Sequence, residues 1–361
     1  MELGLMFFST QTRSADRKYQ LLLDAARFAD REGFSSVWTP ERHFDAFGGI
    51  FPNPAVTSAA LAMITRRLQL RAGSLISPLH HVVRIVEEWS VVDNLSGGRV
   101  ALSFGSGWNV NDFIFFPDRY ETRQLHMYEQ IEQVQRLWRG EPVVQRNSYG
   151  KEVELSIHPK PLQPVLPTWV TSSGNVETFR SAGRIGANLL THLIGQDVDA
   201  LEEKIRAYRE ARAESGFPAD EGVVSLMLHT FVGTDVEEVR ETVRQPFREY
   251  LRSAVLLETA AARGGGTVSG GRRIGAQELP PEIMDELLDM TFDRYFHTAA
   301  LMGTPDSCLP LLDRLDRAGV DEIACLIDFG VAEEEVLRGL EHLGALRRML
   351  SVDQGIVAHP S

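Results

Sequence analysis

Cysteine is scarce in this sequence, which has only Cys308 and Cys325 among its 361 residues and no CxxC spacing. A disulfide framework or a zinc knuckle needs more thiols at closer spacing, so neither organises the fold. The adjacent histidines His80 and His81 have no third ligand at helical spacing, and no HExxH motif occurs. We therefore expect two small buried cysteines and no metal site.

Long apolar runs and an excess of positive charge are also missing. No run reaches about 18 apolar residues, so no membrane-spanning helix is predicted. The opening MELGLMFFSTQ contains Glu2 and no basic leader, which favours a strand over a signal peptide. The 37 basic and 50 acidic residues give a net charge of −13, which argues against nucleic acid or an anionic membrane as a partner. The expected location is the cytoplasm.

Short apolar strands alternate with amphipathic helices along the chain, a pattern that predicts parallel strands with helical crossovers. The predicted strands span residues 3–8, 35–39, 68–76, 100–104, 168–171, 187–191, 223–232 and 321–327. Eight such units point to a closed (β/α)₈ TIM barrel. An open doubly wound sheet, the alternative, would usually place GxGxxG after its first strand, where this chain has Ser9-Thr10-Gln11-Thr12. We predict one α/β barrel domain over residues 1–361, with insertions after strands four and seven.

A glycine-rich stretch lies between the seventh and eighth predicted strands. Residues 263–273 contain five glycines, Gly265 among them, and cannot pack a core. We predict a mobile loop over about residues 258–281. Loops after strands lie on the active-site face of a barrel. Two interpretations stay open: a lid that closes over substrate, or a tolerated surface loop.

The strand at 168–171 leads into a predicted anion site. Ser172, Ser173, Gly174 and Asn175 follow it at a helix start. Free N–H groups at a helix N-terminus bind anions, hydroxyl and amide groups add donors, and glycine lets the backbone approach closely. A phosphate fits such a site. The alternative is an ordinary capped helix without a ligand.

Charged residues and histidines follow three other strands. Glu41, Arg42 and His43 come after the second strand, where they could bind substrate and move protons, or form only a local ion pair. His192 ends the sixth strand and His229 lies near the end of the seventh. Each of these two could donate a hydrogen bond to a ligand or be a satisfied histidine near the core.

Small and aromatic residues mark the ends of strands three and four. Gly73 and Ser74 suggest unusual backbone geometry or a flat ligand lying close. Gly105 and Gly107 open space, and Trp108 offers an aromatic wall. Together the strand ends predict a large cleft at one end of the barrel, with an anion anchor on one side.

Several segments together resemble the luciferase-like flavin monooxygenase family, over nearly the whole chain. They are the run Glu87-Glu-Trp-Ser-Val-Val-Asp-Asn-Leu-Ser-Gly-Gly-Arg99, the Gly-Ser-Gly-Trp-Asn after the next strand, the Glu-Arg-His-Phe of strand two, and residues 167–192. Further segments are similar to the mupirocin-type branch associated with nonribosomal peptide and polyketide gene clusters. These are Pro78-Leu-His-His, Leu190-Thr-His-Leu, Met227-Leu-His-Thr-Phe and Cys325-Leu-Ile-Asp-Phe-Gly.

The resemblance implies noncovalently bound FMN and assigns residues to its parts. The phosphate-binding residues would be Ser172, Ser173, Gly174 and Asn175. The residues along the isoalloxazine would be Gly105, Ser106, Trp108, Thr191 and His192, and Thr171 would be a further cofactor-binding residue. The strand-three floor, where this family often has a cis non-proline peptide, would be Gly73, Ser74 and Leu75. Arg42 stands where luciferases often have a second histidine, and Ser106 where they can carry a phosphate-binding arginine.

The implied activity is that of a two-component monooxygenase. Reduced FMN, supplied by a separate reductase, would react with molecular oxygen to give a C4a-hydroperoxide that oxygenates a small or carrier-protein-tethered substrate in natural-product biosynthesis. His43 and His192 would be catalytic. The residues around the substrate would be Glu41, Arg42, His81, His229 and Gly265. The resemblance also suggests a dimer or tetramer. Two other functions stay open: deazaflavin-dependent hydride transfer, and flavin binding without turnover.

Overall fold

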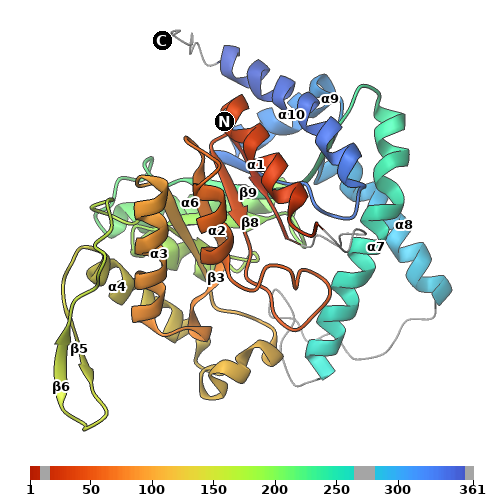
Figure 1. Ribbon diagram of the computed structural model, residues 1–361. Helices are drawn as coiled ribbons and strands as arrows, with labels where there is room; N and C mark the ends of the chain where they lie inside the picture. The colour runs from red at the N-terminus through yellow and green to blue at the C-terminus, as the bar shows by residue number, and fades with distance from the viewer. Residues whose placement is uncertain (9–16, 264–280, 354–361) are drawn as a thin grey trace.

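A computed structural model of the chain describes residues 1–8, 17–263 and 281–353 (Figure 1). Parallel strands form a closed barrel at its centre, in the order β1-β2-β3-β4-β7-β8-β9-β11, and the pairing of β9 with both β8 and β11 closes the ring. The barrel strands are β1 (Glu2–Met6), β2 (Ser36–Thr39), β3 (Gln69–Ile76), β4 (Val100–Gly105), β7 (Thr168–Thr171), β8 (Asn188–His192), β9 (Val224–Val232) and β11 (Glu322–Leu326). The predicted TIM barrel is confirmed.

Helices surround the barrel, because strands buried on both faces need cover on the outside. They are α1 (Gln20–Glu32), α2 (Pro54–Ala62), α3 (Val82–Ser96), α4 (Arg123–Trp138), α5 (Val176–Arg184), α6 (Val198–Glu214), α7 (Val236–Arg263), α8 (Pro281–Thr298), α9 (Pro305–Arg317) and α10 (Glu333–Asp353). Three short 3₁₀ helices lie at Ser77–Leu79, Val110–Phe115 and Pro117–Arg119. Among the described residues, no helix is both long and apolar enough to cross a membrane.

Local capping explains where several helices begin and end. Asn53 precedes Pro54 at the start of α2, and its side chain accepts a hydrogen bond from Ala55 N–H at 2.9 Å. Thr304 and Pro305 start α9 in the same manner. Gly33 ends α1 in the left-handed conformation, with φ of 78°. All three boundaries were predicted.

A polar layer fills the barrel interior near the amino ends of the strands. Arg71 Nη1 donates to Glu322 Oε2 at 2.5 Å, and its guanidinium lies between the rings of Trp38 and Trp169. Ser225 donates to the same carboxylate oxygen at 2.6 Å. Burial alone would raise the pKa of Glu322, but Arg71 and the hydroxyl groups of Ser225, Ser35 and Ser36 outweigh burial and lower it. This layer plugs one end of the barrel, so an open cavity is confined to the other.

Insertions follow β4 and β9, as predicted. The first includes the hairpin of β5 (Val143–Arg146) and β6 (Glu152–Leu155), which projects from the barrel in Figure 1. The second contains α7, α8 and a short strand, β10 (Leu301–Gly303), which pairs with the last three residues of β9. Neither α8 nor β10 was predicted.

The predicted boundary of the glycine-rich loop is wrong at its start. Helix α7 continues to Arg263, so residues 258–263 are helical. Three of these six residues are alanine, which has the highest helix propensity, and the helix extends to the first glycine. The rest of the predicted loop, including Gly265, lies outside the described residues.

Helices α7 and α8 lie side by side (Figure 1) and are joined by a ladder of surface ion pairs. Its rungs are Arg240–Asp293 at 2.7 Å, Arg244–Asp289 at 3.2 Å, Arg248–Asp285 at 3.4 Å and Arg252–Asp285 at 2.5 Å. The arginines recur every four residues on one face of α7. Beneath the ladder, the ring of Phe247 on α7 contacts Phe292 and Tyr295 on α8.

Candidate active site

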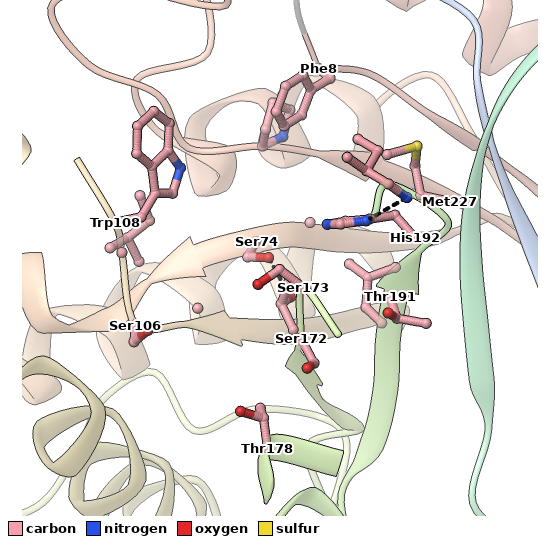
Figure 2. A pocket seen from close by; sticks show the side chains of 18 of the residues that line it. Phe8, Ser74, Ser106, Trp108, Ser172, Ser173, Thr178, Thr191, His192 and Met227 are labelled. Atoms are coloured by element: carbon pink, nitrogen blue, oxygen red, sulfur yellow. Dashed lines mark hydrogen bonds between the residues drawn. The ribbon is translucent and has the colours of Figure 1, made fainter. Parts of the chain in front are cut away.

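A cavity of about 560 Å³ opens at the carboxyl ends of the barrel strands (Figure 2). Most of the predicted site residues line it: Glu41, Arg42, Gly73, Ser74, Gly105, Ser106, Trp108, Thr171, Ser172, Ser173, Asn175, Thr191, His192 and His229. Leu75, Gly174, His43 and His81 do not line it. Leu75 is packed in the hydrophobic core. Strands far apart in sequence thus converge on one space.

One end of the cavity, the phosphate end, is lined by hydroxyl and amide groups from β7 and α5: Ser172, Ser173, Asn175, Thr178 and Ser181. Asn175 caps α5, with its side chain accepting from Glu177 N–H at 2.9 Å. Gly174 has a φ of +108°, which favours glycine and turns the chain into the helix. Helix N-termini with such hydroxyl neighbours bind anions.

Two cations, one lining the cavity and one beside the phosphate end, were not predicted. Arg123, on α4, lines the cavity. Lys204, on α6, lies so close to Gly174 that a Cβ on that glycine would be 3.4 Å from its Nζ. Burial lowers the pKa of Lys204. No motif marks either residue, since their positions depend on how α4 and α6 pack beside α5.

The other end of the cavity, the aromatic end, is lined by large side chains that follow β1 and β2 or lie in β9, α7 and α8. They are Phe8, Phe47, Met227, His229, Tyr250 and Tyr295. Figure 2 shows Phe8 across the cavity from Ser172 and Thr178. This matches the strand order, in which β1 and β7 are four strands apart in either direction around the barrel. The two ends therefore suit different parts of a ligand, or two ligands together.

The floor between the two ends is built from strand ends with small residues. A Cβ on Gly73 would lie 3.0 Å from Trp38 Cε3, and one on Gly107 would lie 2.8 Å from Ile76 Cγ2. The peptide between Gly73 and Ser74 is cis, as the family resemblance predicts. Beside it, the hydroxyl of Thr171 is within hydrogen-bond distance of Ser74 Oγ, at 2.5 Å. A flat cofactor with a phosphate fits this arrangement, since the floor carries only small side chains and the donors gather at one end.

His192 is a neutral hydrogen-bond donor on the cavity wall. Its Nδ1 accepts from Ile194 N–H at 3.1 Å, so the ring proton is on Nε2. Burial lowers the pKa of His192 to about 4. Figure 2 shows the ring extending into the cavity from β8. It can donate to a ligand but stays uncharged near neutral pH.

His229 is a second neutral imidazole, on the neighbouring strand β9. Burial, together with nearby His192, lowers its pKa to about 3. Its ring meets Phe247 and Tyr250 edge-on, with centroids 4.8 and 4.7 Å away. Its buried Nε2 has no hydrogen-bond partner within the described part of the chain. An unpaired buried nitrogen beside a cavity is suited to a ligand group.

Glu41 is the centre of a buried hydrogen-bonded cluster. Its Oε1 accepts from Nε2 of His80 at 2.6 Å and of His43 at 2.9 Å, and its Oε2 accepts from Ile76 N–H at 2.7 Å. Burial would raise the pKa of Glu41, but these hydrogen bonds outweigh burial and lower it. Burial would lower the pKa of His80, but Glu41 outweighs burial and raises it. His43 lies beyond the main cavity, in a side pocket of about 30 Å³ that Glu41 also lines.

The choice of His81 as a cavity residue is wrong, and its neighbour His80 is the one that reaches the cluster. His81 is exposed and caps α3, where its Nδ1 accepts from Val83 N–H at 3.3 Å. Asp112 also lines the side pocket, and burial raises its pKa to about 6 against the opposing effect of His43 and Arg42. No group of three or more potential metal ligands occurs among residues 1–8, 17–263 and 281–353.

Comparison with known proteins identifies the family. Residues 1–322 match the luciferase-like monooxygenase family. The chain is 23% identical over 336 residues to the oxygenase component of flavin-dependent trigonelline monooxygenase from Acinetobacter baylyi, covering 90% of this chain and 88% of that one.

Two solved structures share the fold. The oxygenating constituent of 3,6-diketocamphane monooxygenase from Pseudomonas putida, solved with FMN, superposes with a TM-score of 0.72 at 18% identity over 95% of this chain and 96% of that one. Coenzyme F420-dependent tetrahydromethanopterin reductase from Methanopyrus kandleri gives 0.70 at 16% identity over 96% and 99%. With the match over residues 1–322, the chain belongs to the luciferase-like monooxygenase family and is an enzyme of the flavin-dependent monooxygenase type.

Proposed function

We propose that this chain is the oxygenase component of a two-component monooxygenase that uses reduced FMN. The observation that carries the proposal is the two-ended cavity, with hydroxyl groups and the N-terminus of α5 at one end and aromatic side chains at the other. A phosphorylated flavin fits the first end, and an organic substrate fits the second. A separate flavin reductase follows from the family's two-component relatives.

The protein groups have separate tasks in this proposal. Ser172, Ser173 and Asn175 hold the phosphate, and the bare floor at Gly73 and Gly107 takes the flat ring. Bound reduced FMN supplies the electrons and activates dioxygen as the C4a-hydroperoxide. The aromatic end keeps water away from the reacting atoms.

His192 and the Glu41 cluster provide the polar contacts near the reacting atoms. The Nε2–H of His192 donates a hydrogen bond without carrying charge, so it can stabilise a developing negative charge without forming an ion pair beforehand. Glu41 lines both the main cavity and the side pocket, and it joins His43 to the main cavity. We assign His43 the storage and return of a proton through this contact.

We also propose a substrate class for this oxygenase. The residues that resemble the mupirocin-type branch favour a small or carrier-tethered substrate of a peptide or polyketide pathway. The test is an otherwise intact pathway that lacks only this protein. Continued formation of the fully oxygenated product would rule the assignment out. A dimer or tetramer remains a prediction.

The activity is tested by mixing the protein anaerobically with photoreduced FMN and then adding oxygen in a stopped-flow spectrometer. An intermediate that absorbs in the near ultraviolet and outlives free reduced flavin is expected. Oxidation at the rate of free flavin, with and without candidate substrates, would contradict the proposal. FMN that binds tightly but gives no oxygen uptake would indicate a flavin-binding protein without turnover.

The same assay, run with each cofactor, distinguishes FMN from the deazaflavin. The fold is shared with a coenzyme F420-dependent enzyme, and fold alone does not choose the cofactor. We expect FMN to bind more tightly than the deazaflavin, because the relative that is 23% identical over 90% of this chain is a flavin-dependent monooxygenase. Tighter binding of the deazaflavin, with turnover indifferent to oxygen, would reverse this assignment.

A further inference from the structure

We propose that Arg42 binds a carboxylate of the substrate, so that the enzyme acts on organic acids whose apolar or aromatic body fills the aromatic end of the cavity. The inference rests on the proposed function, because it concerns the substrate of that same site.

The guanidinium of Arg42 has aromatic neighbours but no acceptor. It lies 4.4 Å from the ring centroid of Phe8 and 5.2 Å from that of Phe47. Within the described part of the chain, no group accepts a hydrogen bond from it and no carboxylate lies within ion-pair distance. A guanidinium has five N–H donors in a planar fork, and that of Arg42 is half-buried without a protein acceptor among the described residues. A planar bidentate acceptor is the group that matches this fork.

The surroundings keep Arg42 charged without using its N–H groups. Burial lowers the pKa of Arg42, and Tyr250, Asp112, Asp45 and Asp328 raise it through longer-range electrostatic interactions. Two of these carboxylates also hold the chain near the flanking rings. Asp328 accepts from Phe8 N–H at 2.9 Å, and Asp45 accepts from Phe47 N–H at 2.7 Å. Arg42 lines the cavity, and the described residues leave its N–H groups without an acceptor, so a ligand in the cavity can supply one.

The position of Arg42 assigns it to the substrate and not to the flavin phosphate. The phosphate end lies after β7, whereas Phe8, which the guanidinium contacts, follows β1 on the opposite side of the barrel. Arg42 and the aromatic residues line the same cavity. An anion that pairs with Arg42 would place its attached body among Met227, His229 and Tyr250. A free carboxylate on an apolar body has this shape and charge.

The test compares an acid with its neutral amide. The probes are para-fluorophenylacetate and para-fluorophenylacetamide, followed by fluorine NMR on the FMN-loaded protein and on the flavin-free protein. The acid is expected to bind at least about tenfold more tightly than the amide. Arg42→Met, which keeps an apolar stem between the two rings, should remove this preference. Arg42→Lys should keep part of it, because it retains the charge but loses the fork.

Arg31→Gln is the matched control, since Arg31 also stacks on a phenylalanine, at 5.2 Å from the Phe28 ring, but is exposed and far from the cavity lining. It should leave the preference for the acid unchanged. Equal binding of acid and amide by the natural protein, or no binding of the acid, overturns the proposal. A preference that persists in Arg42→Met overturns it too. An equal loss of FMN affinity in Arg42→Met would assign Arg42 to the flavin instead.

The outcome is separable from that of the proposed function. The probe measurement on flavin-free protein needs no turnover, so a preference for the acid can be observed even if oxygen is not activated. Conversely, a long-lived oxygen intermediate can form in a protein that does not discriminate acid from amide. Each result therefore bears on one proposal only.

Discussion

Glu41 and His80 form a buried pair between the ends of β2 and β3, with 2.6 Å between Oε1 and Nε2. The pair makes the unfolding free energy depend on pH in two opposite directions. The lowered pKa of Glu41 gives a stabilisation that is present above about pH 4.5 and is lost as pH falls through the folded-state pKa. The raised pKa of His80 gives one that is present below about pH 6.5 and is lost as pH rises through its folded-state pKa.

Replacing Glu41 should remove the alkaline part of this dependence. Glu41→Gln leaves His80 without its carboxylate, so the unfolding free energy should fall by about 3 kcal/mol below pH 6.5 and no longer decline just above it. Urea unfolding at a series of pH values measures this. Glu141→Gln, at an exposed ion pair, is the control and should leave the pH dependence as it is. An alkaline decline as steep as in the natural protein would show that the pair is not its source.

His229 should make the protein less stable in acid. The folded-state pKa of His229 is lowered to about 3. Its contribution to the unfolding free energy is therefore present above about pH 6.5 and is lost as pH falls from 6.5 towards 3. Each pH unit in this window costs about 1.4 kcal/mol per such group. His229→Phe suits the aromatic surroundings and should reduce the loss of stability between pH 7 and 5, read from urea midpoints.

Only the comparison between variants isolates this histidine. Asp112, with its pKa raised to about 6, stabilises the folded state as pH falls over part of the same range and so offsets the histidines. His126→Phe, at a half-buried position on α4 outside the cavity lining, is the matched comparison. If His229→Phe and His126→Phe gave the same acid slope, buried neutral His229 would not be a source of it.

Asn175 should affect both helix α5 and FMN, whereas Asn53 should affect only its helix. Each caps a helix through its side chain, so Asn175→Ala and Asn53→Ala should each cost about 1 kcal/mol of stability. Only Asn175 lines the cavity. FMN affinity, measured by fluorescence quenching, should fall about tenfold in Asn175→Ala and stay constant in Asn53→Ala. Equal affinities in the two variants would remove Asn175 from the cofactor site.

Alanine substitutions at Gly107 and Gly97 distinguish the effect of a steric clash from the effect of backbone strain. Both have positive φ, of 78° and 74°, so alanine at either position should cost about 1–2 kcal/mol of stability. A Cβ on Gly107 would lie 2.8 Å from Ile76 Cγ2, and one on Gly97 would meet nothing within 4 Å. Gly107→Ala should therefore be the less stable variant and lose FMN affinity, while Gly97→Ala keeps it. Calorimetry with and without FMN measures both effects, and matching FMN affinities would contradict the assignment of Gly107 to the floor.

Local signals predicted most of the barrel because its strands and caps are specified by neighbouring residues. The apolar run of β9 and the Asn53-Pro54 start of α2 need no knowledge of distant parts of the chain. β10 was missed because three residues carry no periodicity, and its pairing with β9 depends on how the chain returns after α8. The helical residues 258–263 were not predicted, because the glycines that follow them predict a loop.

The candidate site was predicted where it depends on strand ends and missed where it depends on packing. Strand ends meet at one end of any barrel, so Ser172 and His192 could be assigned from sequence. His80 and His81 could not be distinguished, because which of two adjacent side chains reaches Glu41 is decided by the 3₁₀ turn before them. Lys204 is brought to Gly174 only by the packing of α6 on α5.

Arginine–aspartate pairs join α7 to α8, so ionic strength should affect the packing of the two helices that line the aromatic end of the cavity. Tyr250 and Tyr295, which line that end, are carried by these two helices. Exposed ion pairs weaken as salt screens them over about 10 Å at 0.1 M, whereas the contacts of Phe247 with Phe292 and Tyr295 do not. Added salt should therefore loosen the two helices against each other while the barrel stays folded, so substrates should enter and leave at rates that depend on the buffer.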